Sequence, residues 1–362
     1  MIMCKQRERQ MSKRSIALIG AVVFSAVSAF ASSVHAWDHG GHMATASIAF
    51  AEIERARPDL IEKIGQVLLS HPDPGPFAVA AGESSGKERM RQMFIECARW
   101  PDDARFTIHD RPAWHTARWP LIADDAPPEA KAAAEARGDA PAGQAIEALK
   151  LNFAVLSNPE AKPAERATAL CWVLHLVGDI HQPMHVTDLF SKEFPAGNAA
   201  GTTVYVADPM GESTMPLHML WDSNTLRSTE LEEVDQHARE FVEAYPRSAL
   251  AELEAHGKPD AFREWARESY TLAEDFAYGY GIETASDPNK DLDPDRLLKN
   301  MMKWIVEGIS PVAEAPEVPA EYWEKLQVVA HRRITLAGYR LADLIISAAD
   351  RIAAQRQHTR VP

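Results

Sequence analysis

Histidine and aspartate residues occur along this 362-residue chain in short runs whose spacing suits metal coordination. The densest run, HLVGDIHQPMH, spans residues 175–185. His175 and Asp179 are four positions apart, so a helix projects both side chains from one face toward one ion. Pro183 interrupts such a helix and allows His185 to turn elsewhere. The run therefore predicts a helix that supplies ligands to a metal centre.

Three further segments carry the same residue types. Their candidate ligands are His42, Asp102, His115, His218 and Asp222, the last two again four positions apart. Histidine, aspartate and water are ligands that suit zinc. Apolar packing around a buried polar centre is what a metal site needs of its surroundings. Five of the nine tryptophans lie within three residues of a candidate ligand or are one, namely Trp37, Trp100, Trp114, Trp172 and Trp221.

Helices must position almost all of these residues, because apolar side chains recur at helical spacing through most of the chain. Residues 202–206, TTVYV between two turn signals, are the one segment that favours a strand. Residues 124–141 are rich in alanine, proline and charge, and they predict a loop or a short exposed helix. We expect one all-α domain with at most one small β-hairpin. The periodic segments include 42–56, 57–71, 142–157, 166–180, 259–280 and 321–354.

The first 36 residues are predicted to be a signal peptide rather than part of the fold. Basic residues precede an uncharged stretch, and small residues at Val34 and Ala36 suit cleavage after Ala36. A retained membrane anchor is the alternative, but the apolar stretch is short for a span of about 20 residues. Either Met1 or Met11 is the true start. We expect an exported protein, periplasmic or extracellular, with no membrane association after cleavage.

The charge balance limits what the protein can bind. Its 38 Lys and Arg against 52 Asp and Glu give a formal net charge of −14. A broad basic face for duplex nucleic acid is not expected, because phosphate neutralisation needs clustered Lys and Arg. Metal ions would have to hold any phosphate instead. Hydrophobic residues make up 46% and charged residues 25% of the chain, an ordinary globular balance. We expect one domain at residues 37–350 and a tail at 351–362.

The order and local spacing of these residues resemble the nuclease type I family, the secreted trinuclear-zinc nucleases and 3′-nucleotidases that act on single strands. The resemblance runs from Trp37 to about residue 350. It implies the mainly helical fold of that family and of zinc-dependent phospholipase C. It also implies a hydrolase that cuts single-stranded DNA or RNA to 5′-phosphate products. The resemblance does not fix the oligomeric state, for which we expect a monomer. 3′-Nucleotides are the second substrate that it implies.

The resemblance further implies three zinc ions in one cleft, two of them bridged by a shared aspartate. Such a pair lowers the pKa of a shared water, while the third ion stabilises the departing 3′-oxygen. The implied ligands are, for the first ion, Asp102, His115, His175 and Asp179; for the second, the α-amine and carbonyl of Trp37, His42 and the bridging Asp179; and for the third, His185, His218 and Asp222.

Two further residues match phosphate-binding positions of the family. Arg105, three residues after Asp102, matches its phosphate-contacting arginine. Asn198 matches its Gly-Asn turn and is expected to contact the phosphate, with a plain turn as the alternative. Thr116 and Arg118 depart from the pattern, because many fungal members have an aromatic and an acidic residue there that bind the base. The base preference of those family members therefore cannot be transferred to this chain.

Other polar residues lie near the expected ligands. His39, His109 and His181 are interpreted as neighbours of the ligands or as surface residues. Cys97 and Cys171 precede two ligands expected to share an ion, so a disulfide is one alternative. Two buried thiols are the favoured interpretation.

Two other functions remain as alternatives. One is a zinc-dependent phospholipase C, which three features oppose: His42 lies only five residues after Trp37, the last ligand pair is His-x3-Asp rather than His-x3-Glu, and Arg105 is present. The other is a non-enzymatic zinc-binding protein of the periplasm. A metal store would not need an open bridged pair beside an arginine.

Overall fold

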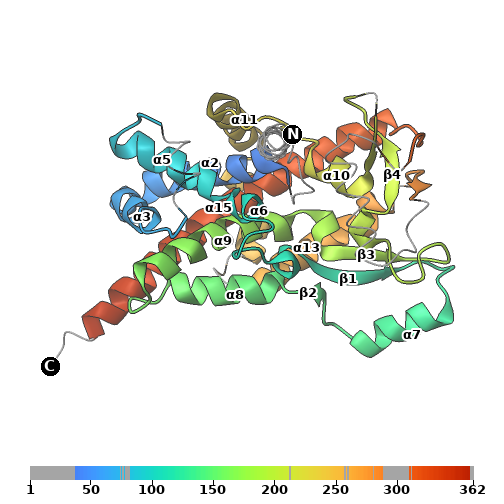
Figure 1. The fold of residues 1–362 in the computed structure, drawn as a ribbon, viewed down its shortest axis with the longest axis horizontal. Helices are drawn as coiled ribbons and strands as arrows, with labels where there is room; N and C mark the ends of the chain where they lie inside the picture. Colours follow the sequence, from blue (N-terminus) through green and yellow to red (C-terminus); the bar gives the residue numbers. More distant parts are fainter. Residues whose placement is uncertain are drawn as a thin grey trace, which may run out of the picture.

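The computed structural model describes residues 37–358, apart from 74, 76, 78–81, 212, 257, 259–260, 280, 288–309 and 311. Helices dominate this part of the chain (Figure 1). Its α-helices are α2 (His39–Ala56), α3 (Leu60–Leu68), α5 (Gly86–Cys97), α6 (Trp100–Asp103), α7 (Pro128–Arg137), α8 (Ala145–Leu156), α9 (Pro163–His181), α10 (Leu217–Asp222), α11 (Leu231–Ala244), α12 (Glu252–Ala255), α13 (Phe262–Leu272) and α15 (Ala320–His358). The short helical turns are η1 (Pro112–His115), η2 (Pro183–Val186), η3 (Ala199–Gly201), η4 (Arg247–Ala249) and the π-type η5 (Ala273–Ala277).

Helix α9 lies in the interior of the molecule, between α8 and the pair formed by α2 and α15 (Figure 1). Every residue from Ala169 to His181 is buried, so this part of the helix has no solvent face. Pro163 stands in the first turn, where its missing N–H would have no helical partner. The helix ends at His181 because Pro183 cannot continue it, and η2 follows. The break predicted from the proline is therefore confirmed.

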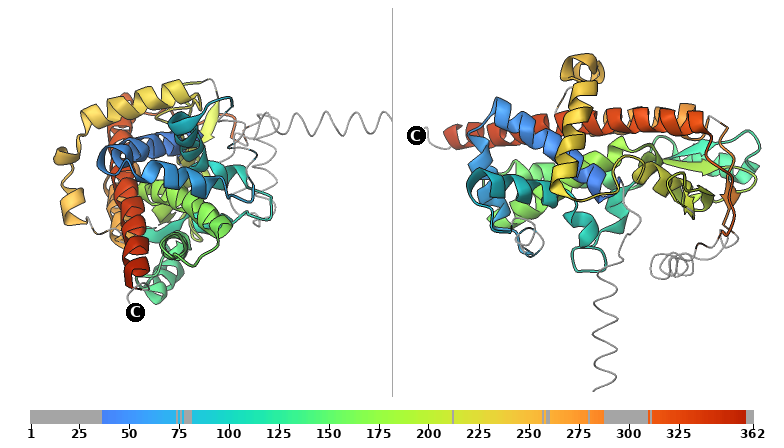
Figure 2. Two further views of the ribbon diagram at one scale, coloured as in Figure 1. Left: turned by 90° about the vertical axis from the view of Figure 1, so that its left-hand side faces the viewer. Right: turned by 90° about the horizontal axis from the view of Figure 1, so that it is seen from above.

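The longest helix, α15, runs along most of the molecule and lies against α2 (Figures 1 and 2). Gly338 makes the close approach of the two helices feasible. A Cβ at this position would lie 2.7 Å from Ile48 and 3.0 Å from the carbonyl oxygen of Thr45. Because α2 carries His42 near its start, the packing of α15 fixes one side of the metal centre.

Two small sheets complete the fold, each with three strands in the part of the chain that the structure describes. The strands are β1 (Ala117–Ile122), β2 (Ala142–Gly143), β3 (Thr187–Phe190), β4 (Val204–Ala207), β5 (Thr214–Pro216) and β6 (Ala285–Ser286). β1 pairs antiparallel with β2 and parallel with β3; β4 pairs antiparallel with both β5 and β6. The β-content therefore exceeds the single hairpin that the sequence suggested, while the mainly helical class is confirmed.

The parallel pairing of β1 and β3 has a direct consequence for the metal centre. β1 begins two residues after His115 and β3 begins two residues after His185. Trp119 lies opposite Thr187 in the shared register. The two strands therefore place the turns η1 and η2 side by side, each ending near a candidate ligand.

Most sequence-based expectations for single elements are confirmed. Residues 202–206 supply β4, and residues 124–141 contain the short helix α7. The signal-peptide prediction concerns residues outside the described part of the chain. Helix α15 continues through residues 351–358, where a tail was expected. No helix among the described residues is long and apolar enough to cross a membrane.

Candidate metal centre

The structure brings the side chains nominated as metal ligands into three buried groups. Within each group, one nitrogen or oxygen atom of every member lies within 4.8 Å of those of the others. His175 belongs to two groups, and these two adjoin each other. The groups are His42, His175 and Asp179; Asp102, His115 and His175; and His185, His218 and Asp222.

Asp179 lies between the first two groups. Its Oδ1 is 3.4 Å from Nε2 of His42 and 3.4 Å from Nε2 of His175. Its Oδ2 is 3.3 Å from Nδ1 of His115, which is itself 3.7 Å from Oδ1 of Asp102. One carboxylate thus faces ligands of both groups. The spacing of His175 and Asp179 within α9 produces the contact between these two side chains, as the helical period predicts.

Main-chain carbonyl oxygens orient three of the histidines. Nδ1 of His175 lies 2.8 Å from the carbonyl oxygen of Ala98, and Nδ1 of His185 lies 2.7 Å from that of His115. Nδ1 of His218 lies 2.7 Å from the carbonyl oxygen of Ala200. A carbonyl oxygen only accepts, so each Nδ1 carries the proton and each Nε2 keeps its lone pair. This is the arrangement by which proteins orient metal-binding histidines.

The third group is assembled from η2 and α10. Nε2 of His185 and Nε2 of His218 lie 3.1 Å apart. Two lone pairs that face each other at this distance repel unless a cation lies between them. The carboxylate of Asp222 completes the group at 3.7 Å from His185 and 3.4 Å from His218. His218 and Asp222 share one face of α10, which begins directly after β5.

The electrostatics of the three groups also suit a cation. Burial raises the pKa of Asp102 and Asp179, and it raises the pKa of Asp222 to about 6. Burial lowers the pKa of His115 and of His185 to about 4, which keeps both imidazoles neutral. Neutral imidazole is the form that binds a metal, and a bound cation would keep the carboxylates ionised.

Several atoms of the site lack a hydrogen-bond partner of ordinary geometry. They include both carboxylate oxygens of Asp179, Nε2 of His115 and Oδ2 of Asp222, all buried. Buried polar atoms are otherwise almost always satisfied. The set of imidazole nitrogens and carboxylate oxygens fits zinc, which takes such ligands in fours and keeps an open position in catalytic sites.

The first described residues, Trp37 and Asp38, form hydrogen bonds to the elements that carry the same site. Trp37 is fully buried, and its indole Nε1 donates to the carbonyl oxygen of Gly178 at 3.1 Å. The backbone N–H of Asp38 donates to the carbonyl oxygen of Asp222 at 2.9 Å. A Cβ on Gly178 would lie 2.7 Å from Nδ1 of His42, so only glycine leaves room for that ring. Residue 37 therefore lies beside α9 and α10, as a role in the site requires.

Arg105 lies at the exposed side of the group formed by Asp102, His115 and His175. Its Nη2 and Nε donate to Oδ1 of Asp102 at 3.0 and 3.3 Å. The side chain of Arg105 is 24% exposed while that of Asp102 is fully buried. The guanidinium thus reaches from the buried carboxylate toward solvent.

Asn198 is buried in the turn that supports the third group. Its Oδ1 accepts from the N–H of Leu189 and of Gly201, and its Nδ2 donates to the hydroxyl of Tyr278 at 3.1 Å. The same turn presents the carbonyl of Ala200 to His218. Asn198 therefore shapes the turn, and its contact with a phosphate stays a prediction.

The three further histidines singled out from the sequence have different surroundings. His39 lies 3.6 Å from Asp103, and His109 packs near the ring of Trp100. His181 is fully buried and bonds to Arg340 at 2.9 Å, away from the ligands that share α9. A surface position, one of the two interpretations of His181, is wrong, because the side chain is completely buried in a charged network.

Sequence reasoning missed Gln182, which is fully buried. Its Nε2 donates to Oδ1 of Asp222 at 2.6 Å, so it orients a ligand of the third group. Its Oε1 accepts from the backbone N–H of Met184 at the start of η2. Its position between His181 and Pro183, inside the densest ligand run, was the signal that could have identified it.

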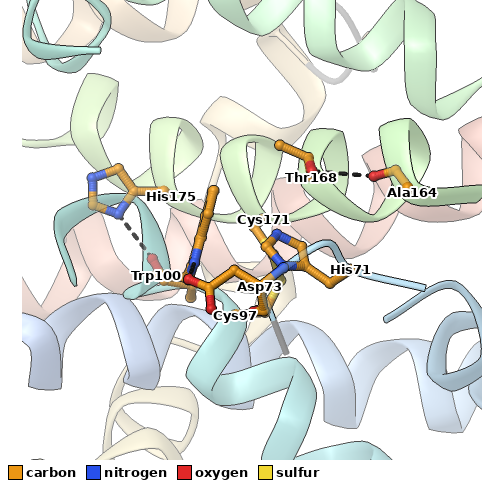
Figure 3. The surroundings of a disulfide bond; sticks show 9 residues. His71, Asp73, Cys97, Trp100, Ala164, Thr168, Cys171 and His175 are labelled. Carbon is orange, nitrogen blue, oxygen red and sulfur yellow. Dashed lines mark hydrogen bonds between the residues drawn. A yellow bond between two sulfur atoms is a disulfide. The ribbon is translucent and has the colours of Figure 1, made fainter. Parts of the chain in front are cut away.

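Cys97 and Cys171 form a disulfide, so the favoured interpretation of two thiols was wrong. The bond joins the end of α5 to the middle of α9 (Figure 3). The two cysteines are 74 positions apart, and it is the packing of α5 against α9 that brings their Cα atoms within 5.0 Å, which the sequence alone does not show. The residue after Cys97 is Ala98, whose carbonyl orients His175.

Comparison with known proteins defines the class to which this arrangement belongs. Residues 37–350 match the family described as S1/P1 Nuclease, and the chain therefore belongs to the S1/P1 nuclease family. The resemblance drawn from the ligand motifs is confirmed.

Two curated relatives show how distant the similarity is. Nuclease S1 of Aspergillus oryzae is 26% identical over 264 residues, which cover 69% of this chain and 78% of that protein. Endonuclease 2 of Arabidopsis thaliana is 25% identical over 175 residues, which cover 48% of this chain. The chain spans about half the length of Endonuclease 2, with 49% of that protein covered.

Proposed function

We propose that this protein is a zinc-dependent phosphodiesterase that hydrolyses single-stranded DNA or RNA and leaves 5′-phosphates, with 3′-nucleotidase activity as well. The observation that supports this best is the buried position of Asp179 between two His/Asp groups, with the partly exposed Arg105 beside Asp102. On a chain of net charge −14, bound cations and this arginine are the means of attracting a phosphodiester.

Three zinc ions, when bound, would supply Lewis acidity and would lower the pKa of a water molecule toward neutrality. The residues of the chain would hold and orient the reactants. Asp179 would join two of the ions, while His175, His185 and His218 keep Nε2 unprotonated through their carbonyl partners. Arg105 stabilises negative charge on the non-bridging phosphate oxygens during displacement.

Asn198 is the second residue to which we assign a phosphate contact. Its Nδ2 has two hydrogens, and the Tyr278 hydroxyl accepts one of them. Burial raises the pKa of Tyr278 well above its ordinary value, so that hydroxyl stays protonated and neutral. These bonds fix the plane of the buried amide, and we assign its second N–H to a substrate oxygen.

The substrate is proposed to be single-stranded because a recessed site admits a flexible strand more readily than a rigid duplex. The ligand atoms are buried, and the net charge offers no broad basic face to a double helix. We further propose that the chain is exported as a precursor, that cleavage after Ala36 releases a monomer, and that this product works outside the cytoplasm.

One experiment separates this function from its alternatives. The zinc-replete protein beginning at Trp37 is incubated in parallel with single-stranded DNA, duplex DNA, RNA, 3′-AMP and phosphatidylcholine. We expect rapid cleavage of the single strands, slow cleavage of duplex, release of phosphate from 3′-AMP and 5′-phosphate ends. Turnover of the lipid alone would establish a phospholipase C. Stoichiometric zinc with no turnover of any substrate would indicate a zinc-binding protein.

A further inference from the structure

A cavity of about 570 Å³, here called the end cavity, lies where α15 ends. Residues of α3, of the end of α8, of the first turns of α9 and of the last part of α15 line it, and these segments come together at the left of Figure 1. Its volume is within the range of roughly 300–1,000 Å³ that ligand pockets have. Arg166, which lines the end cavity, precedes His175 by roughly 14 Å along the axis of α9. The end cavity is therefore separate from the metal centre.

The buried part of the cavity wall is aliphatic. It includes Leu60 and Ile64 of α3, Leu170 of α9 and Ile345 of α15. Among the described residues that line the end cavity, none is aromatic. Bases bind proteins largely by stacking on aromatic rings, so this wall offers a nucleotide no such partner. An aliphatic chain, in contrast, is transferred favourably from water to a wall of this kind.

The charged part of the wall is entirely cationic within the described part of the chain. Arg57, Lys63, Arg166 and Arg356 line the end cavity, and no aspartate or glutamate lines it with them. The whole sequence has the opposite balance, with 52 acidic against 38 basic residues. Charge complementarity therefore favours a ligand that carries a negative charge.

Two of the four cations are engaged by carboxylates that do not line the end cavity. Nη1 of Arg57 donates to Asp350 of α15 at 2.6 Å, and its Nε donates to Asp59 at 2.9 Å. Nζ of Lys63 also donates to Asp59, at 2.9 Å. The bond between Arg57 and Asp350 joins the start of α3 to α15. These pairs stabilise the walls, and they leave the other side of the end cavity for an anion.

Arg166 has the surroundings of an anion-binding side chain. Its Nε is buried and has no hydrogen-bond partner, which is uncommon for a buried polar atom. Burial and the nearby charge of Arg356 lower the pKa of its guanidinium. A carboxylate bound here would accept from Arg166 and would reduce the repulsion between the two arginines.

We propose that the end cavity binds a free long-chain fatty acid, with its alkyl chain against the aliphatic wall and its carboxylate at Arg166 and Arg356. This inference does not depend on the proposed function, because it concerns another site and another ligand. A free acid is favoured over the acyl chain of a membrane lipid. A protein of net charge −14 is repelled by an anionic bilayer, whereas one dissolved molecule needs only the local cations.

The test titrates the zinc-loaded protein with dodecanoate, below the concentration at which micelles form, in a calorimeter. We expect saturable binding of one molecule per chain. Decanoate, which is two methylenes shorter, should bind roughly tenfold more weakly. Dodecyltrimethylammonium has the same chain and the opposite charge, and it should not bind. Equal affinity for the two dodecyl compounds, or no saturable binding of dodecanoate, would overturn the proposal.

Two variants locate the binding site. Arg166→Gln should weaken dodecanoate binding roughly tenfold. Arg239→Gln removes the same charge from an exposed position of α11 and is the matched control, which should bind as wild type does. Ala349→Phe places a ring inside the end cavity and should also weaken binding at least roughly tenfold, with zinc content and circular dichroism as checks of folding.

Equal losses in Arg166→Gln and Arg239→Gln would show that binding is not at the end cavity. Vesicles of phosphatidylglycerol test the membrane as the source of the chain. Capture of the protein by these vesicles without binding of free dodecanoate would assign a membrane lipid instead and would overturn the proposal. Because none of these measurements uses cleavage, a protein that binds dodecanoate but cuts no nucleic acid would refute only the proposed function.

Discussion

His175, His185 and His218 each use the Nδ1 proton on a main-chain carbonyl oxygen, which leaves Nε2 directed into a metal group. The acceptors lie 77, 70 and 18 positions away along the chain. The ligand pair within α9 follows from the helical period, whereas the orientation of each ring depends on distant backbone. At the scale of single residues, Asp179 stands out among the three candidate carboxylate ligands because it contacts His42 of one group and His115 of another.

Substitution of Asp179 by asparagine should therefore cost more metal and activity than the same change at Asp222. Asn keeps the size of the side chain but removes the charge that would join two ions, whereas Asp222 serves one group. We expect Asp222→Asn to lose about one zinc and Asp179→Asn to lose more, with turnover at least about a hundredfold lower in the latter. Zinc analysis and turnover on single-stranded DNA measure both. Three zinc ions and normal turnover in Asp179→Asn would refute the bridge.

At the scale of elements, α9 connects the metal groups to the rest of the fold. It carries His175 and Asp179, and it is cross-linked to α5 by the disulfide of Cys171 with Cys97. The carbonyl of Ala98, the residue after Cys97, accepts the Nδ1 proton of His175. The disulfide therefore holds together a ligand helix and the backbone group that orients its ligand.

The double variant Cys97→Ser, Cys171→Ser should be less stable and should bind zinc more weakly. Loss of the cross-link releases a loop of 74 residues in the unfolded chain. We expect the free energy of unfolding to fall by about 2–4 kcal/mol. Urea titration measures this change, and competition with a chelator measures zinc affinity. The wild-type protein treated with a reductant is the matched control, and unchanged zinc affinity would show that the disulfide does not affect His175.

The elements also show what sequence can and cannot predict. Helices α2, α8, α9 and α15 were predicted because apolar periodicity is a local signal. The pairing of β1 with β3 was missed, because the partners are far apart in sequence and Pro120 stands within β1. The disulfide was only the less favoured alternative and Gln182 was missed for the same reason: each depends on how segments pack. The members of the three His/Asp groups were predictable because residue spacing and the family pattern both point to them.

At the scale of the whole molecule, a buried charged network joins α9, α13 and α15. Arg333 and Arg340 are each 1% exposed, and both bond to Glu268. Nε of Arg333 also donates to the carbonyl of His181 at the end of α9. Burial alone would raise the pKa of Glu268, but hydrogen bonds from Arg340 and the charges of both arginines hold it well below its usual range.

Glu268→Gln should destabilise the protein and change its pH dependence. The variant leaves two buried guanidinium groups without their carboxylate, which costs about 3–5 kcal/mol. Because the folded-state pKa of Glu268 is depressed, its stabilisation is present above the unfolded pKa of about 4.3 and is lost as pH falls below it. Denaturant titration from pH 7 to pH 3 should show the difference from wild type shrinking with acid. Glu264→Gln, an exposed position of α13, is the control; a constant difference across this range would contradict the assignment.

The first residues of the domain, Trp37 and Asp38, contact the elements that carry the metal centre. The indole N–H of Trp37 donates to the carbonyl oxygen of Gly178, and the backbone N–H of Asp38 donates to that of Asp222. A free α-amine on Trp37, with a pKa of about 7.7–8.0, can give up its proton to a metal. The nitrogen of a peptide bond between Ala36 and Trp37 has no available lone pair. Removal of the predicted leader would therefore create a ligand.

Proteins beginning at Trp37 and proteins with one methionine before it should accordingly differ. We expect the extended protein to fold, because the side-chain ligands are intact, but to lack about one zinc and most of its activity. Zinc analysis, turnover on single-stranded DNA and thermal unfolding compare the two. Trp37→Phe in the cleaved form is the control: it loses the indole bond to Gly178 but keeps the amine, so its zinc content should stay close to wild type. Equal zinc and turnover in the extended and cleaved proteins would show that the amine is not a ligand and that Trp37 acts only through its buried ring.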